Sequence, residues 1–267
     1  MKYEKILTEG AGVPYLTTPD FAARPELAAG FATRRGGVSR PPYDTFNFGF
    51  NRGDDPEAVR QNYRTFAAAI GANPERFAAV KQVHSSVVLL APQETLANPF
   101  TKEKLKDADG VITNTPGVFP VCYYADCIPT LLYEPQARCW AAVHSGWRGA
   151  AEGIVGIAIS RMREELGADP AKMLMAIGPS ICPECFEVGP EVAGKFDADL
   201  VLTGYEKPHV DLWRAVERSA VSAGVRPDHI TCMGECTMEY IDCYFSHRAH
   251  GERRGVLMAA IGLPVRS

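Results

Sequence analysis

Short apolar runs and longer amphipathic stretches alternate along this chain. Four runs of strand length cover Val118–Tyr124, Arg138–Val143, Met173–Ile177 and Val256–Leu263, and residues 108–112 re-enter the core after a polar connection. Because these runs are shorter than a typical helix and are bounded by polar or turn residues, they predict buried β-strands. Weaker patterns predict an edge strand at 13–16 and extended structure over 77–90.

Helical periodicity marks the longer stretches. Asp54-Asp55-Pro56-Glu57 places an acidic cap ahead of a proline in the first turn, and Gly71 ends the apolar pattern. The stretch Ala150–Leu166 is amphipathic, and we expect Ile154, Ile157, Ala158 and Met162 to face inward. Further helices are predicted at 190–196 and 210–223, the second with Leu212, Trp213, Val216 and Val221 available for packing.

The order and spacing of these elements indicate the fold class. Strands and helices alternate loosely, connections are short, and the sequence has no internal repeat or evident linker. We therefore predict an α+β protein in which residues 1–267 form a single compact domain, with mixed β-sheets flanked by helices.

Composition narrows the class of function. The 267 residues are 46% apolar and 22% charged, as in an ordinary globular enzyme, and the net charge of −4 argues against nucleic acid as a partner. The N-terminal segment lacks the apolar core of a signal peptide, and no apolar run is long enough to span a bilayer. We expect a cytoplasmic protein without a membrane partner, either a monomer or a weak homodimer.

Reactive side chains follow two of the predicted strands. Asp126-Cys127 comes after the first strand and His144 after the second, so a thiol and an imidazole at neighbouring strand ends can share a pocket. Arg148 lies in a glycine-flanked turn ahead of a helix, a setting that suits an anion. His84 occupies a comparable position beside apolar segments.

These residues have three possible interpretations. His84, Cys127 and His144 can form a zinc site whose fourth position stays open for catalysis. The same residues can instead form a metal-free site in which a histidine activates the Cys127 nucleophile. Ordinary buried packing is the third interpretation, and the sequence spacing alone does not separate the three.

Two further clusters are candidates for function. Arg34-Arg35-Gly36-Gly37 puts cations beside a flexible turn whose backbone N–H groups can bind an oxyanion, although a plain hairpin turn explains the same pattern. Cys182 and Cys185, together with Cys232 and Cys236, suggest a structural metal or redox site. Packing of buried thiols is the alternative, since the two pairs lie far apart in the sequence.

Taken together, the motifs resemble the YfiH/YlmD-like family, labelled as polyphenol oxidases or laccases and associated with purine nucleoside phosphorylase activity. HSGWRG at 144–149 and ADCIP at 125–129 are the most specific segments. The others are TRRGGVS at 33–39, Asn47-Phe48-Gly49, Gly53-Asp54 with Asn62, Gln82-Val83-His84, Ala108-Asp109-Gly110, Gly178-Pro179-Ser180-Ile181, Cys236-Thr237 and Ser246-His247-Arg248. They cover nearly the whole chain in family order.

The resemblance implies a YfiH-like fold and a catalytic zinc ion on His84, Cys127 and His144. It implies cleavage of adenosine or inosine by phosphate to give the base and ribose 1-phosphate. Methylthioadenosine phosphorolysis and adenosine deamination are further expected activities. The sequence departs from the family pattern at Ile181-Cys182-Pro183-Glu184-Cys185, and Gly255 is followed by Val256 where the family has arginine, with Arg253 and Arg254 nearby.

We assign site roles on this basis. Asp126, Cys127 and Arg148 are the predicted catalytic residues, with Asp126 moving a proton or orienting a ligand, or simply capping a strand. The predicted phosphate and substrate contacts are Arg34, Arg35, Gly36, Gly37, Asn47, Arg148 and His247.

Two rival activities use the same residues. A copper-dependent, laccase-like polyphenol oxidase needs many paired histidines, whereas the chain has six and no His-x-His, although copper can replace zinc at nitrogen and sulfur ligands. An amidase that edits peptidoglycan precursors would use Cys127 as its nucleophile. The sequence does not select among the possible nucleosides.

Overall fold

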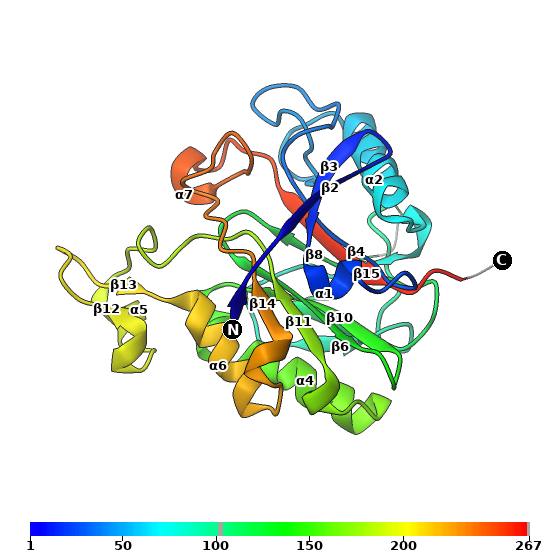
Figure 1. Ribbon diagram of the computed structural model, residues 1–267. Coiled ribbons are helices and arrows are strands. Elements are labelled where there is room, and N and C mark those ends of the chain that lie inside the picture. Colours follow the sequence, from blue (N-terminus) through cyan, green and yellow to red (C-terminus); the bar gives the residue numbers. More distant parts are fainter. Residues whose placement is uncertain (101–103, 266–267) are drawn as a thin grey trace.

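The computed structural model describes residues 1–100 and 104–265, and within them two large β-sheets form the core (Figure 1). The seven-stranded sheet runs in the order β1 (Lys2–Tyr3), β14 (Ile230–Cys232), β11 (Leu174–Ile177), β9 (Ile128–Glu134), β10 (Cys139–Ser145), β7 (Gly110–Thr113) and β6 (Val88–Leu90). The six-stranded sheet runs in the order β2 (Ile6–Gly10), β3 (Val13–Thr17), β4 (Ala28–Ala32), β15 (Leu257–Gly262), β8 (Phe119–Tyr124) and β5 (Phe77–Ala78). A small ladder pairs β12 (Val201–Leu202) with β13 (His209–Val210).

The helices are mostly short. They are α1 (Pro19–Ala22), α2 (Pro56–Ile70), α3 (Trp147–Ala151), α4 (Ile154–Leu166), α5 (Pro190–Ala193), α6 (Leu212–Ser222) and α7 (His247–His250). Short 3-10 helices occupy Pro74–Arg76, Pro170–Lys172, Ala198–Leu200 and Pro227–His229. In the described ranges, no helix has the length and apolar character needed to cross a membrane.

The two large sheets pack face to face through β8 and β15 on one side and β9 and β10 on the other. Large buried side chains, including Phe31, Tyr133 and Trp140, fill the space between them. Helices α4 and α6 cover the outer face of the seven-stranded sheet, and α2 covers that of the six-stranded sheet (Figure 1). The predicted α+β class with mixed sheets flanked by helices is therefore confirmed.

Helix α2 forms where its capping residues predict it. The Asp55 side chain accepts a hydrogen bond from the Glu57 N–H at 3.0 Å, and Pro56 occupies the first helical position. Gly71 ends the helix in the left-handed conformation with φ 76°, which glycine adopts without steric cost. The buried face carries Val59, Asn62, Tyr63, Phe66, Ala67 and Ile70.

The predicted helix at 150–166 is wrong at its start. The structure has two helices there, α3 and α4, separated at Gly153, whose φ of 72° is incompatible with a continuous helix. The break lets the Gly156 N–H reach the Ser219 hydroxyl on α6 at 3.0 Å. Two side chains predicted to pack inward are exposed: Ile157 of α4 at 36% and Val221 of α6 at 38%.

Strand positions also differ from expectation. The predicted edge strand at 13–16 is β3, which lies between β2 and β4, because the polar strand β2 provides the actual edge. Strand β9 was not predicted at all, although all of its residues are buried. Its omission matters because β9 is the strand that positions the site.

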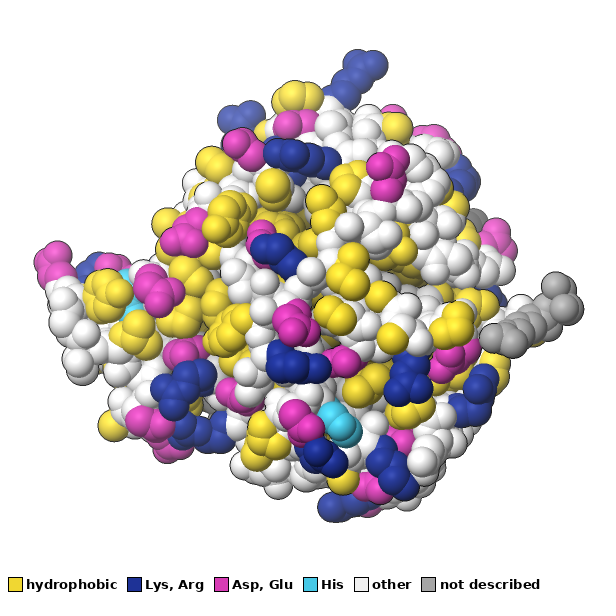
Figure 2. Space-filling model, viewed as in Figure 1, with side chains coloured by type: hydrophobic (Ala, Val, Ile, Leu, Met, Phe, Trp, Pro, Cys, Tyr) yellow, Lys and Arg dark blue, Asp and Glu magenta, His cyan; other side chains and the backbone are white. Residues whose placement is uncertain are grey.

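The face drawn in Figure 2 mixes Lys and Arg with Asp and Glu side chains and has no continuous region of one sign. This distribution agrees with the net charge of −4 and gives no basic surface on this face for a polyanion.

Candidate metal centre and its cavity

The β9–β10 hairpin brings the predicted thiol and imidazole together. His144 pairs with Pro129 and Ser145 with Ile128, so Cys127, immediately before β9, lies beside the end of β10. From the sequence, Cys127 and His144 were expected to meet because the strands that precede them are neighbours. The strand before Cys127 is β8, however, and it belongs to the other sheet. Antiparallel pairing between β9 and β10 is the actual cause.

His84 approaches from the loop between β5 and β6. Its Nε2 lies 3.7 Å from the Cys127 Sγ, and its ring is 5.1 Å from the His144 ring, nearly perpendicular to it. The ligand atoms of all three residues lie within 4.8 Å of one another. His84 has φ 60°, an uncommon conformation for a non-glycine residue that the surrounding hydrogen bonds must maintain.

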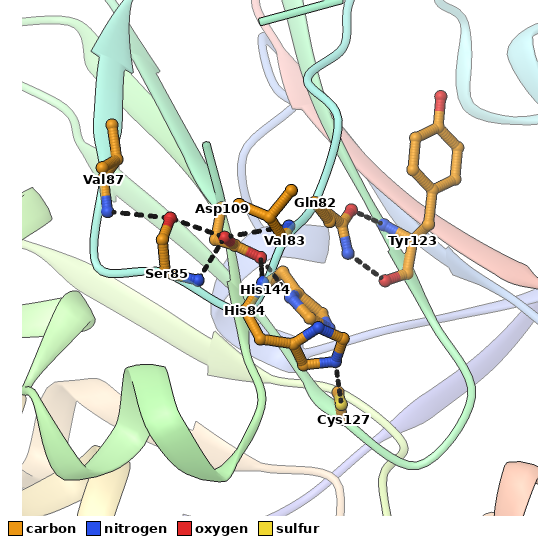
Figure 3. Close-up of polar contacts among 9 residues, drawn as sticks. All are labelled: Gln82, Val83, His84, Ser85, Val87, Asp109, Tyr123, Cys127 and His144. Carbon is orange, nitrogen blue, oxygen red and sulfur yellow. Dashed lines mark hydrogen bonds and ion pairs between the residues drawn. The ribbon is translucent and has the colours of Figure 1, made fainter. Parts of the chain in front are cut away.

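Asp109 maintains that conformation. Its carboxylate accepts hydrogen bonds from the backbone N–H groups of Val83, His84 and Ser85 at 3.2, 3.0 and 2.6 Å, and from the Ser85 hydroxyl at 2.7 Å (Figure 3). It also contacts the His144 Nδ1 at 2.9 Å, and the His144 N–H donates to the Asp109 carbonyl at 2.7 Å. One buried carboxylate therefore positions both histidines.

This arrangement determines which imidazole nitrogen is available. With Nδ1 donating to Asp109, His144 keeps its Nε2 free for a ligand, the usual arrangement around metal-binding histidines. Burial by itself raises the pKa of Asp109, but hydrogen bonds from His144 and Ser85 and the His144 charge lower it to about 2. The sequence motif includes Asp109 without giving it a role; the signal for that role is a single acid inside an apolar segment.

Gln82 provides a second anchor for the same loop. Its side-chain amide donates to the Tyr123 carbonyl at 2.7 Å and accepts from the Tyr123 N–H at 2.6 Å (Figure 3). These two bonds replace a missing neighbouring strand along β8, because they satisfy both backbone groups of a β8 residue. The Gln82-Val83-His84 motif is thus fixed on either side of Val83.

The two glycines of the 146–149 motif provide space for the loop that carries His84. A Cβ atom on Gly146 would lie 2.5 Å from the His84 ring and 3.3 Å from the Cys127 Sγ. A Cβ atom on Gly149 would lie 3.1 Å from the Ser85 carbonyl oxygen. Larger residues at these positions would separate the three candidate ligands.

Electrostatics favours the ionised form of the thiol. Burial by itself raises the pKa of Cys127, whereas the charge and hydrogen bonds of His144 and His84 lower it to about 6. Burial opposes the charge on His144 as well, but Cys127 and Asp109 raise its pKa to about 9. The site therefore stabilises a thiolate, the form in which cysteine binds metals and acts as a nucleophile.

The three side chains form part of the wall of a cavity of about 280 Å³. Aromatic side chains make up much of the opposite wall: Phe48, Phe50, Tyr63 and Tyr123. Phe50, which is half-buried, stacks on the buried Tyr63 with an angle of 18° between the rings, so aromatic side chains and the polar cluster line the same cavity. A cavity that joins an aromatic surface to a few polar groups is typical of a small-molecule site.

A buried arginine contributes the positive charge. Arg254 is 8% exposed and lines the cavity, and its Nη1 donates to the neighbouring Gly255 carbonyl at 2.9 Å. Its Nε has no hydrogen-bond partner although it is fully buried. Burial, together with the nearby charge of Arg52, lowers the pKa of Arg254 to about 10. Arg52 and Lys81 also line the cavity.

The predicted anion turn at 34–37 lies elsewhere. Arg34 is bound to Asp44, through its carbonyl at 2.9 Å and its carboxylate at 3.2 Å, and to the Ile241 carbonyl at 2.7 Å. Arg35 donates to the Asp242 carbonyl at 3.0 Å. A Cβ on Gly36 or Gly37 would clash with Val13 or Thr45, respectively, so both glycines serve close packing. None of these four residues lines the cavity.

Arg148, His247 and Asn47 also lie outside the cavity lining. The Arg148 guanidinium is exposed and stacks over the Trp147 ring at 4.2 Å. The His247 side chain is 51% exposed and lies 4.0 Å from Glu252. Asn47 is fully buried and is held by local hydrogen bonds, so it supports the neighbouring cavity wall and is not itself in contact with the cavity.

Asp126 is used to fix the chain beside Cys127. One carboxylate oxygen accepts from the Thr237 hydroxyl at 2.6 Å and the other from the Arg248 N–H at 2.6 Å. Its φ of 89° is unusual for aspartate. Both oxygens are therefore engaged in the arrangement that the structure describes, and this agrees with the capping role weighed for it from the sequence.

The class of protein can now be stated from its relatives. Residues 28–264 match the model of the family described as multi-copper polyphenol oxidoreductase laccase. A Deinococcus radiodurans protein named purine nucleoside phosphorylase is 36% identical over 259 residues, covering 96% of this chain and 95% of the relative. A Shigella flexneri protein named purine nucleoside phosphorylase YfiH is 33% identical over 240 residues, covering 87% and 93%.

Solved structures agree with these matches. The crystal structure of YlmD from Geobacillus stearothermophilus superposes with a TM-score of 0.89 at 28% identity, over 98% of this chain and 100% of that one. A Bacillus licheniformis protein, YfiH, gives a TM-score of 0.86 at 27% identity, over 93% and 96%. The chain belongs to the YfiH-like, laccase-domain family.

Proposed function

We propose that this protein is a zinc-dependent purine nucleoside phosphorylase that cleaves adenosine or inosine, and methylthioadenosine as a further substrate. The observation that carries the proposal is the lining of one cavity: a His-Cys-His cluster, aromatic side chains and a buried arginine lie around the same space. The names of relatives that match nearly the whole chain support the same activity.

The donor set fits a divalent ion. Two imidazoles and one thiolate match the preferences of zinc, and three protein ligands leave a position open for catalysis. Bound there, zinc would supply Lewis acidity to a substrate group in the cavity. Asp109 fixes the His144 ring and its tautomer, and Gly146 lets the His84 ring approach, so the chain holds the donors in place before binding.

The other cavity residues have matching roles. The aromatic lining of the cavity, which includes Phe50 and Tyr123, suits a purine ring, since purines pack against aromatic side chains. Arg254 suits phosphate because its buried guanidinium has an unpaired Nε, and Arg52 adds a second positive charge. In the reaction a phosphate oxygen bonds to C1′ of the ribose while the bond from C1′ to the base breaks. The bonding electrons go to the base, which takes up a proton.

The test is release of free base from adenosine, inosine and methylthioadenosine, each with and without inorganic phosphate. We expect release only with phosphate, and equimolar ribose 1-phosphate from adenosine and inosine. Inosine formed from adenosine without phosphate would report the deaminase activity that we propose as a side reaction. Release of base at equal rates with and without phosphate would refute phosphorolysis.

Arg254 is tested with a matched control. Arg254→Met keeps much of the side-chain volume but removes the cation, and we expect the KM for phosphate to rise by a factor of about 10–100, the loss typical of a charge-assisted contact. Arg253→Met removes the adjacent arginine, which is exposed and does not line the cavity, and should leave this KM unchanged. Equal effects of both substitutions would remove Arg254 from the phosphate site.

The family description suggests copper chemistry, and the number of histidine ligands in the cluster is evidence against a multi-copper site. Among the described residues, His84 and His144 are the only histidines in groups of three or more potential metal ligands. A multi-copper oxidase needs more imidazoles than this cluster provides. Copper substituting for zinc at one site would instead give oxidase activity that zinc suppresses. Incubation with UDP-linked muropeptides tests the amidase alternative in the same preparation.

A further inference from the structure

We propose that Cys182, Cys185 and Cys236 form a second metal site, one that takes zinc or cuprous copper and serves structure. The site goes beyond the proposed function, since it lies outside the cavity lining. The three sulfur atoms lie within 4.8 Å of one another. Tetrahedral zinc with bonds of about 2.3 Å holds thiolate sulfurs about 3.8 Å apart, so small side-chain rotations suffice for binding.

Two segments distant in the sequence form this thiol cluster. The chain turns tightly at 182–185, with the N–H groups of Cys185 and Phe186 donating to the Cys182 carbonyl at 3.1 and 3.0 Å. Ser180 pairs with Cys236 in an isolated parallel bridge, which places the second segment alongside. The Cys182 N–H donates to the Cys236 Sγ at 3.3 Å, a contact that stabilises negative charge on sulfur.

Simple packing does not explain the convergence. Cys182 and Cys236 are 5% and 1% exposed, but Cys185 is only half-buried, so the cluster opens to solvent on one side. Cys232, which the sequence grouped with Cys236, is buried in β14 and takes no part. Three soft donors with one open direction match a thiolate site for zinc or cuprous copper.

The site has a structural consequence for the catalytic loop. Ile181, next to Cys182, donates its N–H to the Asp126 carbonyl at 2.9 Å, and Thr237, next to Cys236, donates its hydroxyl to the Asp126 carboxylate at 2.6 Å. An ion joining the two segments would therefore fix two of the three groups that hold Asp126, the third being the Arg248 N–H. Because Asp126 precedes Cys127, the second site would stabilise the conformation of a ligand of the first.

The experiment uses the full chain with the first site removed. Elemental analysis should find two metal ions per chain in the wild type. His84→Ala keeps only the second site and should hold one zinc or copper ion. The Cys182→Ser, Cys185→Ser, Cys236→Ser triple variant keeps only the first site and should also hold one ion. Cobalt-loaded His84→Ala should give an intense sulfur-to-cobalt charge-transfer band, as expected for several thiolates. Zinc and cuprous copper are added in separate arms to identify the ion.

A second measurement, made on His84→Ala, tests the proposal even if the triple variant does not fold. In reduced His84→Ala, added metal should protect half-buried Cys185 from alkylation, whereas half-buried Cys243 should react equally with and without metal. Identical labelling in both conditions, or a disulfide between two of the three cysteines in the purified protein, overturns the proposal. Because His84→Ala lacks the first site, these results are independent of phosphorylase activity.

Discussion

Asp109→Asn is the substitution that tests most of the site at once. The variant keeps the size of the side chain but replaces one carboxylate oxygen with an amide nitrogen. One oxygen accepts from the His84 N–H and the His144 ring, and the other accepts from Val83 and from both donors of Ser85. In either amide orientation at least two donors face an NH2 group.

The magnitude follows from the ionisation of the carboxyl group. Lowering its pKa from 3.8 to about 2 corresponds to about 2.5 kcal/mol of folding free energy near neutral pH, at about 1.36 kcal/mol per unit. Loss of charge-assisted hydrogen bonds is of the same order. This stability is present above pH 3.8 and is lost as the pH falls through about 2. We expect metal affinity to fall about 10–100-fold in addition.

The assay is urea unfolding of metal-free protein at neutral pH, followed by competition with a chromophoric chelator for zinc affinity. Asp107→Asn is the matched control, because Asp107 lies two residues away and forms an ion pair with Lys81 at 3.2 Å. Both side chains of this ion pair are 60% exposed. Exposed pairs contribute about 0–1 kcal/mol. If Asp109→Asn lost no more stability or zinc affinity than Asp107→Asn, the organising role assigned to this carboxylate would be refuted.

Three other predictions concern the same region. Gly146→Ala should lower zinc affinity at least about tenfold with the fold retained, since the new methyl group lies 2.5 Å from the His84 ring; unchanged affinity would contradict the packing argument. Gln82→Leu should cost about 1–3 kcal/mol in urea unfolding because both Tyr123 backbone groups lose their partner, and a neutral result would show that water replaces it. Thr237→Val should lower the thermal midpoint and weaken zinc binding, because the Asp126 carboxylate that fixes the chain beside Cys127 loses one of its hydrogen bonds; an unchanged midpoint and zinc affinity would contradict that role.

Much of the scaffold follows from local sequence. The cap at Asp55 and the glycine at 71 define α2 because both act within one turn of the helix ends. The break at Gly153 was missed because glycine is tolerated inside many helices, and the contacts of this region with Ser219 on α6 are not visible in the local sequence. Strand β9 was missed because Pro129 and Thr130 interrupt its apolar run, and a proline within a run argues against a strand.

In the candidate site, too, some features could be predicted from the sequence and others could not. His84, Cys127 and His144 meet, as the sequence motifs indicated, because the β9–β10 pairing and the Asp109 carboxylate bring them together. The phosphate contact that we propose, Arg254, differs from the arginines predicted from the sequence, since the role of an arginine depends on what surrounds it. Arg34 is occupied by Asp44, whereas Arg254, in a charged stretch that reads as surface, is buried with an unpaired nitrogen.

The most direct measurement is a zinc titration of metal-free protein that follows binding and phosphate-dependent release of base in the same sample, for the wild type and for Cys127→Ser. We predict that wild-type turnover rises in proportion to occupancy of the site formed by His84, Cys127 and His144, and that Cys127→Ser shows neither binding there nor turnover. Full turnover by metal-free protein, or by Cys127→Ser, would contradict this prediction.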